Sequence, residues 1–380
     1  MRRVPVGSLL PGMKVGHPVY NSRGEILINR GVILNKKYIC GLLKLGIPAL
    51  YIIDESLPHF YVEDVIDEKT RVATVKLARK ILTGAPDKSP LEMAKPGEVK
   101  ASIGNIIDQL LDNPNLMVNL TDIRSVDDYL YGHSVNVCVL SLITGISLGY
   151  DRTRLMALGI GALMHDLGKT LIPPLILKKP GKLTREEFEV IKKHPEYGYT
   201  ILLNNAPHIK KISAVIALQH HERYNGEGYP KGLQSGAIHE FSQIVGIADV
   251  YDAMTADRVY RKAHPPNEAY EMLAGSGNYF FDFRLVQAFL HNIAAYPAGT
   301  LVRLSSNETA VVVETTRGFS LYPKIKVLYD AAGKKLTTPV DIDMSEQNTL
   351  TIVKVLDEAE FEMLKVRDSI KTGRSSAGTR

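Results

Sequence analysis

Histidines and aspartates in the central third of the chain form a pattern that suits metal-assisted hydrolysis. The set comprises seven side chains: His133, His165, Asp166, His194, His220, His221 and Asp249. Seven side chains are too many for one metal ion, but they suit two adjacent metal ions that share a carboxylate. A glycine-rich stretch at 225–230, with the sequence NGEGYP, follows the double histidine directly. The sequence therefore predicts a binuclear centre, for which a phosphate ester is the natural substrate class.

Taken singly, several of these side chains have ordinary structural explanations. His133 alone would more often be a core or surface histidine than a ligand, and His194, which precedes a proline, could cap a helix. The pair His165 and Asp166 ends an apolar helical pattern, and a buried pair of this kind needs partners. Because adjacent helical residues diverge by about 100°, the histidine could bind one metal ion while the aspartate bridges to a second.

The double histidine His220 and His221 is more informative, since two consecutive imidazoles near a helix end cannot both be buried without partners. Neutral imidazole is a common ligand of zinc, iron and manganese. Asp249 lies among apolar residues and requires a cation or hydrogen bonds, whereas Asp252, one turn later, fits a supporting or capping role. The set contains no cysteine, which excludes a structural zinc site built from thiolates.

Basic and aromatic side chains near these motifs suit the binding of a phosphate ester. Lys169 follows the His–Asp pair by one turn and could neutralise a phosphate oxygen, although a lysine at a helix end can also be simply exposed. The guanidinium groups of Arg223, Arg258 and Arg261 can bind phosphate through two hydrogen bonds, which favours a substrate with two phosphates. Tyr229 could stack on a base or pack within its own turn.

Helical periodicity surrounds the cluster and predicts how it is positioned. Asp151 is placed to cap a helix that runs into the His–Asp pair, with Gly168 ending that helix. Thr184 and Glu187 form a capping-box pair for a helix that ends near His194. Further apolar patterns lead into the double histidine and lie beneath Asp249. The polar residues therefore gather at helix ends that face one cavity.

The remaining patterns predict a multidomain protein in which a central all-α helical bundle lies between two smaller modules. Before about residue 54, short apolar runs alternate with glycine turns, and after residue 297 the periodicity changes to two. The expected parts are a small α+β N-terminal module at 1–84, a linker at 85–98, the helical catalytic domain at 99–296, a small β-rich appendage at 297–358 and a partly disordered tail at 359–380.

Composition sets further limits on the class of protein. The 380 residues carry a formal net charge of +5, which could attract an anionic substrate but is too small to indicate DNA binding. No apolar run of roughly 18 residues and no signal-peptide pattern occurs, so we expect a cytoplasmic protein without a membrane partner. The two cysteines, Cys40 and Cys138, fall in different predicted modules, which fits a reducing compartment.

The order of these motifs resembles the HD-GYP family, bacterial phosphodiesterases of the wider HD hydrolase superfamily. The resemblance covers roughly 122–291 and is carried by HDLGK at 165–169, HHER at 220–223, NGEGYP at 225–230 and ADVYDA at 248–253. It implies an HD-type helical bundle with two or three metal ions, often iron or manganese, that hydrolyses cyclic di-GMP. It also implies that His133, His165, Asp166 and Asp249 bind one metal ion, and that Asp166, His194, His220 and His221 bind the other.

Three departures from the family pattern refine these expectations. Members with a third metal ion carry glutamate where this chain has Tyr129, so we expect two. Val259 and Phe283 replace prolines that are usual in the family, which we expect to alter loop rigidity without removing metal. The N-terminal module is similar to one that often precedes HD-GYP units, and it could receive a regulatory protein partner. Signalling hydrolases of this kind often pair, so a homodimer is also expected.

The hypothesis is an in-line hydrolysis in which a metal-bridging hydroxide attacks phosphorus while Lys169 and the metal ions stabilise the charge. Cyclic di-GMP would give mainly the linear dinucleotide pGpG, with slow conversion to GMP, and the sequence does not identify the general acid. Two other readings stay open: an HD hydrolase of another nucleotide, and a catalytically weak receptor for a cyclic dinucleotide. The additional histidines at 194, 220 and 221 argue against the first, and the intact set of ligands argues against the second.

Overall fold

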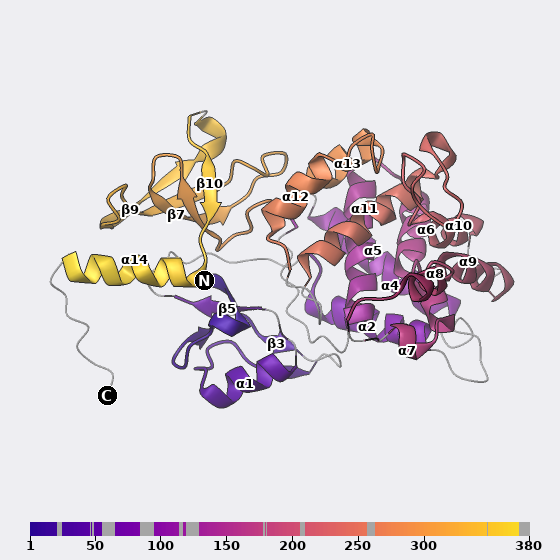
Figure 1. The fold of residues 1–380 in the computed structure, drawn as a ribbon, viewed down its shortest axis with the longest axis horizontal. Coiled ribbons are helices and arrows are strands. Elements are labelled where there is room, and N and C mark those ends of the chain that lie inside the picture. The colour runs from indigo at the N-terminus through magenta and orange to yellow at the C-terminus, as the bar shows by residue number, and fades with distance from the viewer. Residues whose placement is uncertain are drawn as a thin grey trace.

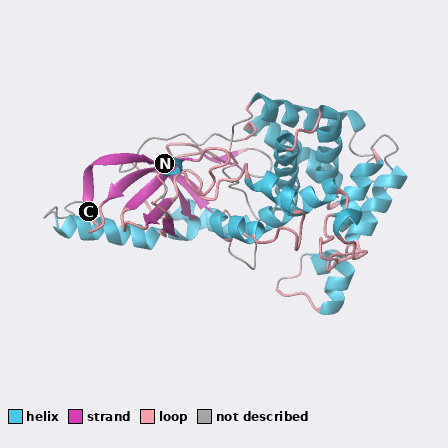
Figure 2. Ribbon diagram, turned by 90° about the horizontal axis from the view of Figure 1, so that it is seen from above, coloured by secondary structure: helices cyan, strands magenta, loops and turns pink. Residues whose placement is uncertain are grey.

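The computed structural model has a helical part and a part that contains the strands, as Figure 1 and Figure 2 show. It describes all residues except 21–24, 46, 48, 55–64, 84–94, 114–116, 119–128, 178, 180, 206–209, 257–262, 348 and 372–380. The structure confirms the predicted multidomain fold. A central helical bundle follows a small α+β segment and precedes a β-rich region. Within the described residues, no helix is both long and apolar enough to cross a membrane.

The N-terminal module combines short strands with one helix. Its elements are β1 (Arg2–Pro5), β2 (Lys14–Val15), β3 (Val19–Tyr20), β4 (Ile26–Ile28), α1 (Lys36–Lys44) and β5 (Ala49–Ile53). The central strand β5 pairs antiparallel with β1 and β2, while β3 and β4 pair with each other. The side chain of Asn35 caps α1 by accepting a hydrogen bond from the backbone nitrogen of Tyr38 at 2.9 Å.

The helical bundle holds the largest apolar core of the described chain. Its helices are α2 (Glu68–Thr83), α4 (Pro96–Asp112), α5 (Tyr129–Ser147), α6 (Arg152–Leu163), α7 (Pro174–Leu177), α8 (Arg185–Ile191), α9 (His194–Asn205), α10 (Lys211–Gln219), α11 (Glu240–Thr255), α12 (Pro266–Ala274) and α13 (Phe283–Leu290). Helix α5 lies at the centre and packs against α2, α4, α6, α11 and α13. Fully buried side chains such as Leu142, Leu158 and Ile244 join these helices, which therefore form a rigid frame for the polar residues at their ends.

The C-terminal module is an antiparallel sheet with a helix on one face. Its elements are β6 (Leu301–Leu304), β7 (Thr309–Glu314), β8 (Lys324–Tyr329), β9 (Lys335–Asp343), β10 (Ile352–Val355) and α14 (Glu358–Lys371), with the strand order β10-β6-β7-β8-β9. Phe361 and Leu364 of α14 pack on Val311 and Leu328 of the sheet. The period-two pattern after residue 297 predicted a β-rich appendage, but it did not reveal β9. That edge strand is mostly exposed and shows no alternation of buried and exposed residues.

The packing differs from the expected module boundaries in three places. Helix α2, assigned to the N-terminal module, places Val75 and Ile81 in the apolar core of the helical bundle. Helix α4 begins at Pro96, inside the segment expected to be a linker, because proline suits the first turn of a helix. The tail from 359, expected to be partly disordered, continues as α14 to Lys371. We therefore propose that the helical unit begins near residue 66 and that the C-terminal module includes α14.

Candidate metal centre

The seven histidines and aspartates come from five places in the helical bundle and meet in one cluster. His133 lies on α5, His165 and Asp166 follow α6, His194 begins α9, His220 and His221 directly follow α10, and Asp249 lies on α11. In the structure α6 ends at Leu163, so the His–Asp pair lies in a turn and not on the helix as predicted. The prediction that Gly168 ends this helix is also wrong, because Gly168 belongs to a short 3₁₀ helix, Leu167–Leu171.

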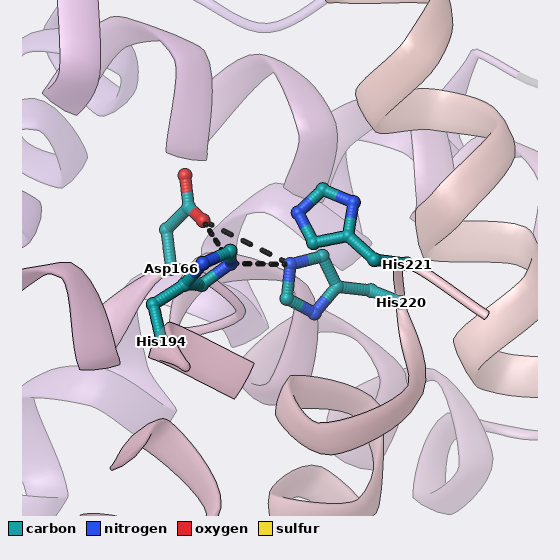
Figure 3. Close-up of side chains that lie close together, drawn as sticks. All are labelled: Asp166, His194, His220 and His221. Carbon is teal, nitrogen blue, oxygen red and sulfur yellow. Dashed lines mark hydrogen bonds and ion pairs between the residues drawn. The ribbon is translucent and has the colours of Figure 1, made fainter. Parts of the chain in front are cut away.

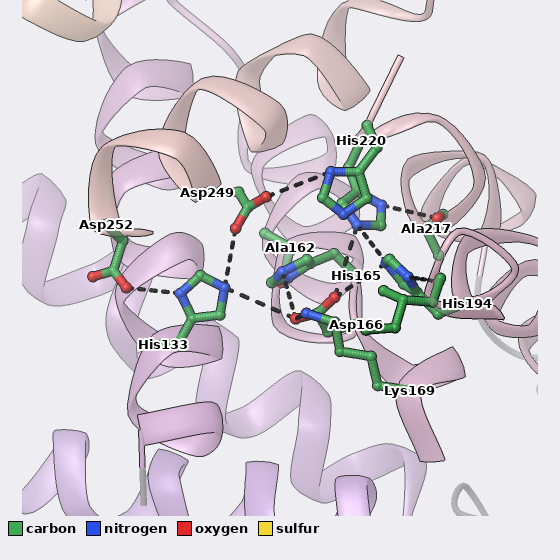
Figure 4. A network of polar contacts seen from close by, with 12 residues as sticks. His133, Ala162, His165, Asp166, Lys169, His194, Ala217, His220, Asp249 and Asp252 are labelled. Carbon is green, nitrogen blue, oxygen red and sulfur yellow. Dashed lines mark hydrogen bonds and ion pairs between the residues drawn. The ribbon is translucent and has the colours of Figure 1, made fainter. Parts of the chain in front are cut away.

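The cluster consists of two groups of possible ligand atoms. Asp166, His194, His220 and His221 form one group (Figure 3), and His133, His165 and Asp249 form the other; within each group all ligand atoms lie within 4.8 Å of one another. The carboxylate of Asp166 faces both. Its Oδ1 is 3.4 Å from Nε2 of His194 and 3.8 Å from Nε2 of His220, whereas its Oδ2 is 3.4 Å from Nε2 of His165 and 3.9 Å from Nε2 of His133. Asp166 is thus positioned to bridge two cations (Figure 4).

Four of the imidazoles are oriented by hydrogen bonds from Nδ1. Nδ1 donates to a main-chain carbonyl oxygen in three of them and to a carboxylate in the fourth: His165 to Ala162 at 2.7 Å, His194 to Ile191 at 2.7 Å, His220 to Ala217 at 2.9 Å and His133 to Asp252 Oδ2 at 2.7 Å. Carbonyl oxygens only accept, so Nδ1 carries the proton and Nε2 of a neutral ring presents its lone pair to the cluster. Nε2 of His194 and Nε2 of His220 are only 3.3 Å apart, an arrangement that a cation between them would stabilise.

Burial and local charge favour the protonation states that bind metal. Burial lowers the pKa of His194 to about 4 and that of His221 to about 3, and it holds the pKa of His220 well below its usual value. Burial opposes the charged form of Asp166, yet the electrostatic influence of Lys169 and His165 outweighs it and keeps the pKa of this carboxyl well below its ordinary range. At neutral pH the group around Asp166 therefore offers neutral imidazoles and an ionised carboxylate.

His133 is held from both sides by carboxylates. Its Nε2 lies 3.1 Å from Asp249 Oδ1, and the second oxygen of Asp252 accepts a hydrogen bond from Asn136 at 2.8 Å. Burial acts to lower the pKa of His133, but hydrogen bonds to Asp249 and Asp252 outweigh it and raise the pKa to about 9. The supporting role predicted for Asp252 agrees with this contact. Asn136 has no counterpart in the sequence prediction, although its position one helical turn after His133 was an available signal.

The chemistry of the donor set fits divalent metal ions. His165 Nε2 and Asp166 Oδ1 are buried and have no hydrogen-bond partner among the described residues. Leaving a buried polar atom unpaired is unfavourable by about 1–3 kcal/mol, so such atoms need an explanation, and metal ligation supplies one here. The ligand atoms are imidazole nitrogens and carboxylate oxygens without thiolate, a set that suits iron, manganese or zinc.

Three of the predicted substrate-binding residues border this cluster. Nζ of Lys169 is 2.6 Å from Asp166 Oδ2, so the lysine is not merely exposed at a helix end. The guanidinium of Arg223 lies 4.8 Å from the ring centroid of Phe281, and its Nη1 is buried without a hydrogen-bond partner in the part of the chain that the structure describes. Tyr229 stacks on His221 with ring centroids 4.7 Å apart.

The other predicted positions are less informative. Arg258 and Arg261, together with Val259, fall at 257–262 and lie outside the described residues. Tyr129 begins α5, but its side chain is not described, and Phe283 begins α13 with an exposed side chain.

Glu222 is a residue of the site that the sequence prediction missed. It is 2 % exposed and its carboxylate accepts hydrogen bonds from the backbone nitrogens of Lys231 at 2.8 Å and Leu233 at 2.9 Å. It thereby ties the segment that directly follows the glycine-rich stretch to the end of α10, next to His221. The available signal was an acidic residue directly after two histidines and directly before a turn-rich stretch.

Comparison with known proteins gives relatives for most of the chain. Residues 112–285 match the family model of an HD domain, and residues 301–364 match that of a KOW domain associated with the HD domain. The chain is 31% identical over 329 residues to the cyclic di-GMP phosphodiesterase PA4108 of Pseudomonas aeruginosa, an alignment that covers 86% of this chain and 76% of the relative. This similarity extends well beyond the HD domain.

Two further relatives match shorter stretches. The cyclic di-GMP phosphodiesterase response regulator RpfG of Xanthomonas campestris pv. campestris is 41% identical over 147 residues, which is 39% of each chain. The 3'3'-cGAMP-specific phosphodiesterase 2 of Vibrio cholerae is 38% identical over 129 residues, which is 34% of this chain and 25% of that protein. The named substrates of these relatives are all cyclic dinucleotides.

Proposed function

Because this chain belongs to the HD-GYP family of cyclic di-GMP phosphodiesterases, we propose that it hydrolyses cyclic di-GMP at the cluster around Asp166. The coarser function, metal-dependent hydrolysis of a cyclic dinucleotide, follows from the family and from the cluster of histidines and aspartates. The main support for this proposal is the position of the Asp166 carboxylate, which has one oxygen toward each group of ligand atoms.

In this proposal two divalent metal ions, iron or manganese, are held by the seven side chains. His133, His165, Asp166 and Asp249 hold one ion, and Asp166, His194, His220 and His221 hold the other. When bound, the metal ions supply Lewis acidity and lower the pKa of water, which provides a nucleophile at neutral pH. The main product proposed is linear pGpG.

The chain's own residues orient the substrate and balance its charge. Lys169 contacts Asp166 and is partly exposed, so its ammonium can turn toward a phosphate oxygen that lies at the cluster. The buried, unpaired Nη1 of Arg223 is a donor suited to the second phosphate of a cyclic dinucleotide. Arg258 and Arg261 are proposed for the same task from the sequence alone.

Turnover of cyclic di-GMP by protein loaded with iron or manganese under reducing conditions tests this proposal. We expect pGpG as the main product, separated and quantified by chromatography. Binding of cyclic di-GMP without turnover with either metal would favour the receptor reading. Turnover of other nucleotides alone would favour the HD hydrolase reading.

Replacing Asp252 by alanine should weaken metal binding by about 10–100-fold without removing a ligand. The variant removes the acceptor that fixes Nδ1 of His133, so Nε2 is no longer held toward Asp249. Metal affinity measured by competition with a chelator checks this. As a control, Asp108→Ala removes an exposed carboxylate on α4 and should leave the metal affinity unchanged. Equal affinities of the two variants would contradict the supporting role.

The roles of the flanking modules remain proposals. We propose that the N-terminal module receives a regulatory input from a protein partner, that two chains pair, and that the protein acts in the cytoplasm. One contact supports communication between the flanking modules: the buried Arg2 binds Asp54 after β5 at 2.8 Å and also Glu358 at the start of α14.

A further inference from the structure

The metal cluster is accessible from one side. The side chains of His221 and Asp249 are 18 % and 14 % exposed, whereas those of His133, His165 and His194 are 3 % exposed or less. A substrate that reaches the cluster must therefore pass His221 and Asp249. The side chains that flank these two residues determine what else of the substrate can be bound.

An aromatic wall leads outward from His221 on this side. Tyr229 stacks on the imidazole of His221 with an angle of 26° between the rings, and the ring of Phe188 on α8 meets Tyr229 edge-on, with centroids 6.4 Å apart. Nζ of Lys192, the residue directly after α8, lies 5.1 Å from the centroid of Phe188 and 5.9 Å from that of Tyr229. The three side chains form a continuous surface of two rings and one cation.

Phe188 of this aromatic wall comes from α8, a helix with a well-defined start. Thr184 and Glu187 form a capping box at the beginning of α8, and Lys179 adds an ion pair to Glu187 at 2.7 Å. Even so, Phe188 is 42 % exposed and belongs to none of the buried apolar clusters of the described chain. A large aromatic ring that is fixed at its base and open on the outside is suited to stacking with a flat ligand.

We propose that Phe188 and Lys192 form a nucleobase subsite that selects guanine. This rests on the proposed function, because it requires a substrate whose phosphate lies at the metal cluster and whose base extends along the wall. The base stacks on Phe188, and the ammonium of Lys192 donates to O6 and N7 of guanine. Lys192 also pairs with Glu189 at 2.8 Å, which uses one of its three N–H groups and leaves two for the base.

The same contact discriminates against adenine. Guanine presents two acceptors, O6 and N7, on this edge, whereas adenine presents an amino donor in place of O6. An ammonium has no acceptor, so Lys192 faces a donor when adenine is bound. Lys192 thus adds a preference that the metal cluster, which contacts only phosphate, does not provide.

Steady-state kinetics of Lys192→Ala with cyclic di-GMP and cyclic di-AMP test this preference. We expect the KM for cyclic di-GMP to rise about tenfold, the kcat to stay within about twofold, and the KM for cyclic di-AMP to change little. Lys193→Ala is the matched control, since it removes the same charge from the neighbouring exposed position. An unchanged ratio between the two substrates in Lys192→Ala would overturn the assignment.

A fluorescence titration tests the stacking without relying on turnover. The chain contains no tryptophan, so Phe188→Trp introduces a single reporter at the proposed platform. Cyclic di-GMP should quench its emission, whereas inorganic phosphate should not, and Phe319→Trp, at an exposed ring of the C-terminal module, should stay unquenched as a control.

These readouts separate the two proposals. If the wild-type protein turns over cyclic di-GMP but Phe188→Trp is not quenched at saturating substrate, the base subsite is wrong and the proposed function stands. If the wild-type protein turns over no cyclic dinucleotide, the proposed function fails. Quenching that occurs nonetheless would show that the platform binds the base in a receptor.

Discussion

Replacing Asp166 by alanine should remove metal from both groups of ligands and lower kcat for cyclic di-GMP by at least about a thousandfold. The carboxylate has one oxygen toward each group, with Oδ1 toward His194 and His220 and Oδ2 toward His133 and His165. Loss of a terminal ligand leaves the other group complete, whereas loss of Asp166 leaves both groups incomplete. The effect should therefore exceed that of any single histidine variant.

Metal analysis of the purified variant, together with kinetics, measures this effect. We expect a metal content close to zero per chain, compared with two for the wild-type protein. His221→Ala is a suitable comparison because it removes a ligand from one group only, and it should retain about one metal ion. Thermal denaturation of both proteins after chelation shows whether each is folded. An Asp166→Ala protein that keeps two metal ions or most of its activity would contradict the bridging role.

The sequence predicted which side chains meet because all but the His–Asp pair lie at positions that helical periodicity defines. Apolar patterns on α10 and α11 lead to His220 and Asp249, and the caps at Asp151 and Thr184 place the starts of α6 and α8. Burial of the apolar faces of these helices in the core around α5 then brings the helix ends together. The chemistry of the residues was therefore sufficient to predict that these histidines and aspartates cluster before any distance was known.

The local geometry around the His–Asp pair depended on tertiary packing that the pattern does not contain. Periodicity extended α6 through His165 to Gly168, since glycine commonly follows a helix end. The structure ends α6 at Leu163 because the chain must turn to bring Gly168 against the backbone of His194. The contact joins two segments that are distant in the sequence, which a local pattern cannot show.

Surface residues were the hardest to interpret from the sequence. Phe188 lies on a short helix, and Lys192 directly after it, in a stretch whose pattern resembles any exposed helix. Their relation to Tyr229 appears only when α8 lies beside the glycine-rich loop. The edge strand β9 was missed for a similar reason, because exposed strands carry no alternating burial.

Replacing Gly168 by alanine should destabilise the protein by about 3 kcal/mol and weaken the metal site that includes His194. A Cβ atom at position 168 would lie 1.9 Å from the carbonyl oxygen of His194 and 2.5 Å from the backbone nitrogen of Gly198. Both are backbone atoms at the start of α9, so no side chain can move aside and the helix itself must shift. His194, at the first position of that helix, would then move away from Asp166 and His220.

The expected signature is a lower melting temperature together with a loss of metal from one group before the other. Equilibrium unfolding of the metal-free protein measures the stability, and metal analysis at limiting chelator measures the occupancy. Gly97→Ala is the control, because Gly97 lies in the first turn of α4 with nothing within 4 Å of the added Cβ, and it should change the stability by no more than about 0.5 kcal/mol. If the free energy of unfolding of Gly168→Ala equalled that of Gly97→Ala, α9 could not be packed against the His–Asp turn as closely as the structure requires. The orientation of His194 would then need another cause.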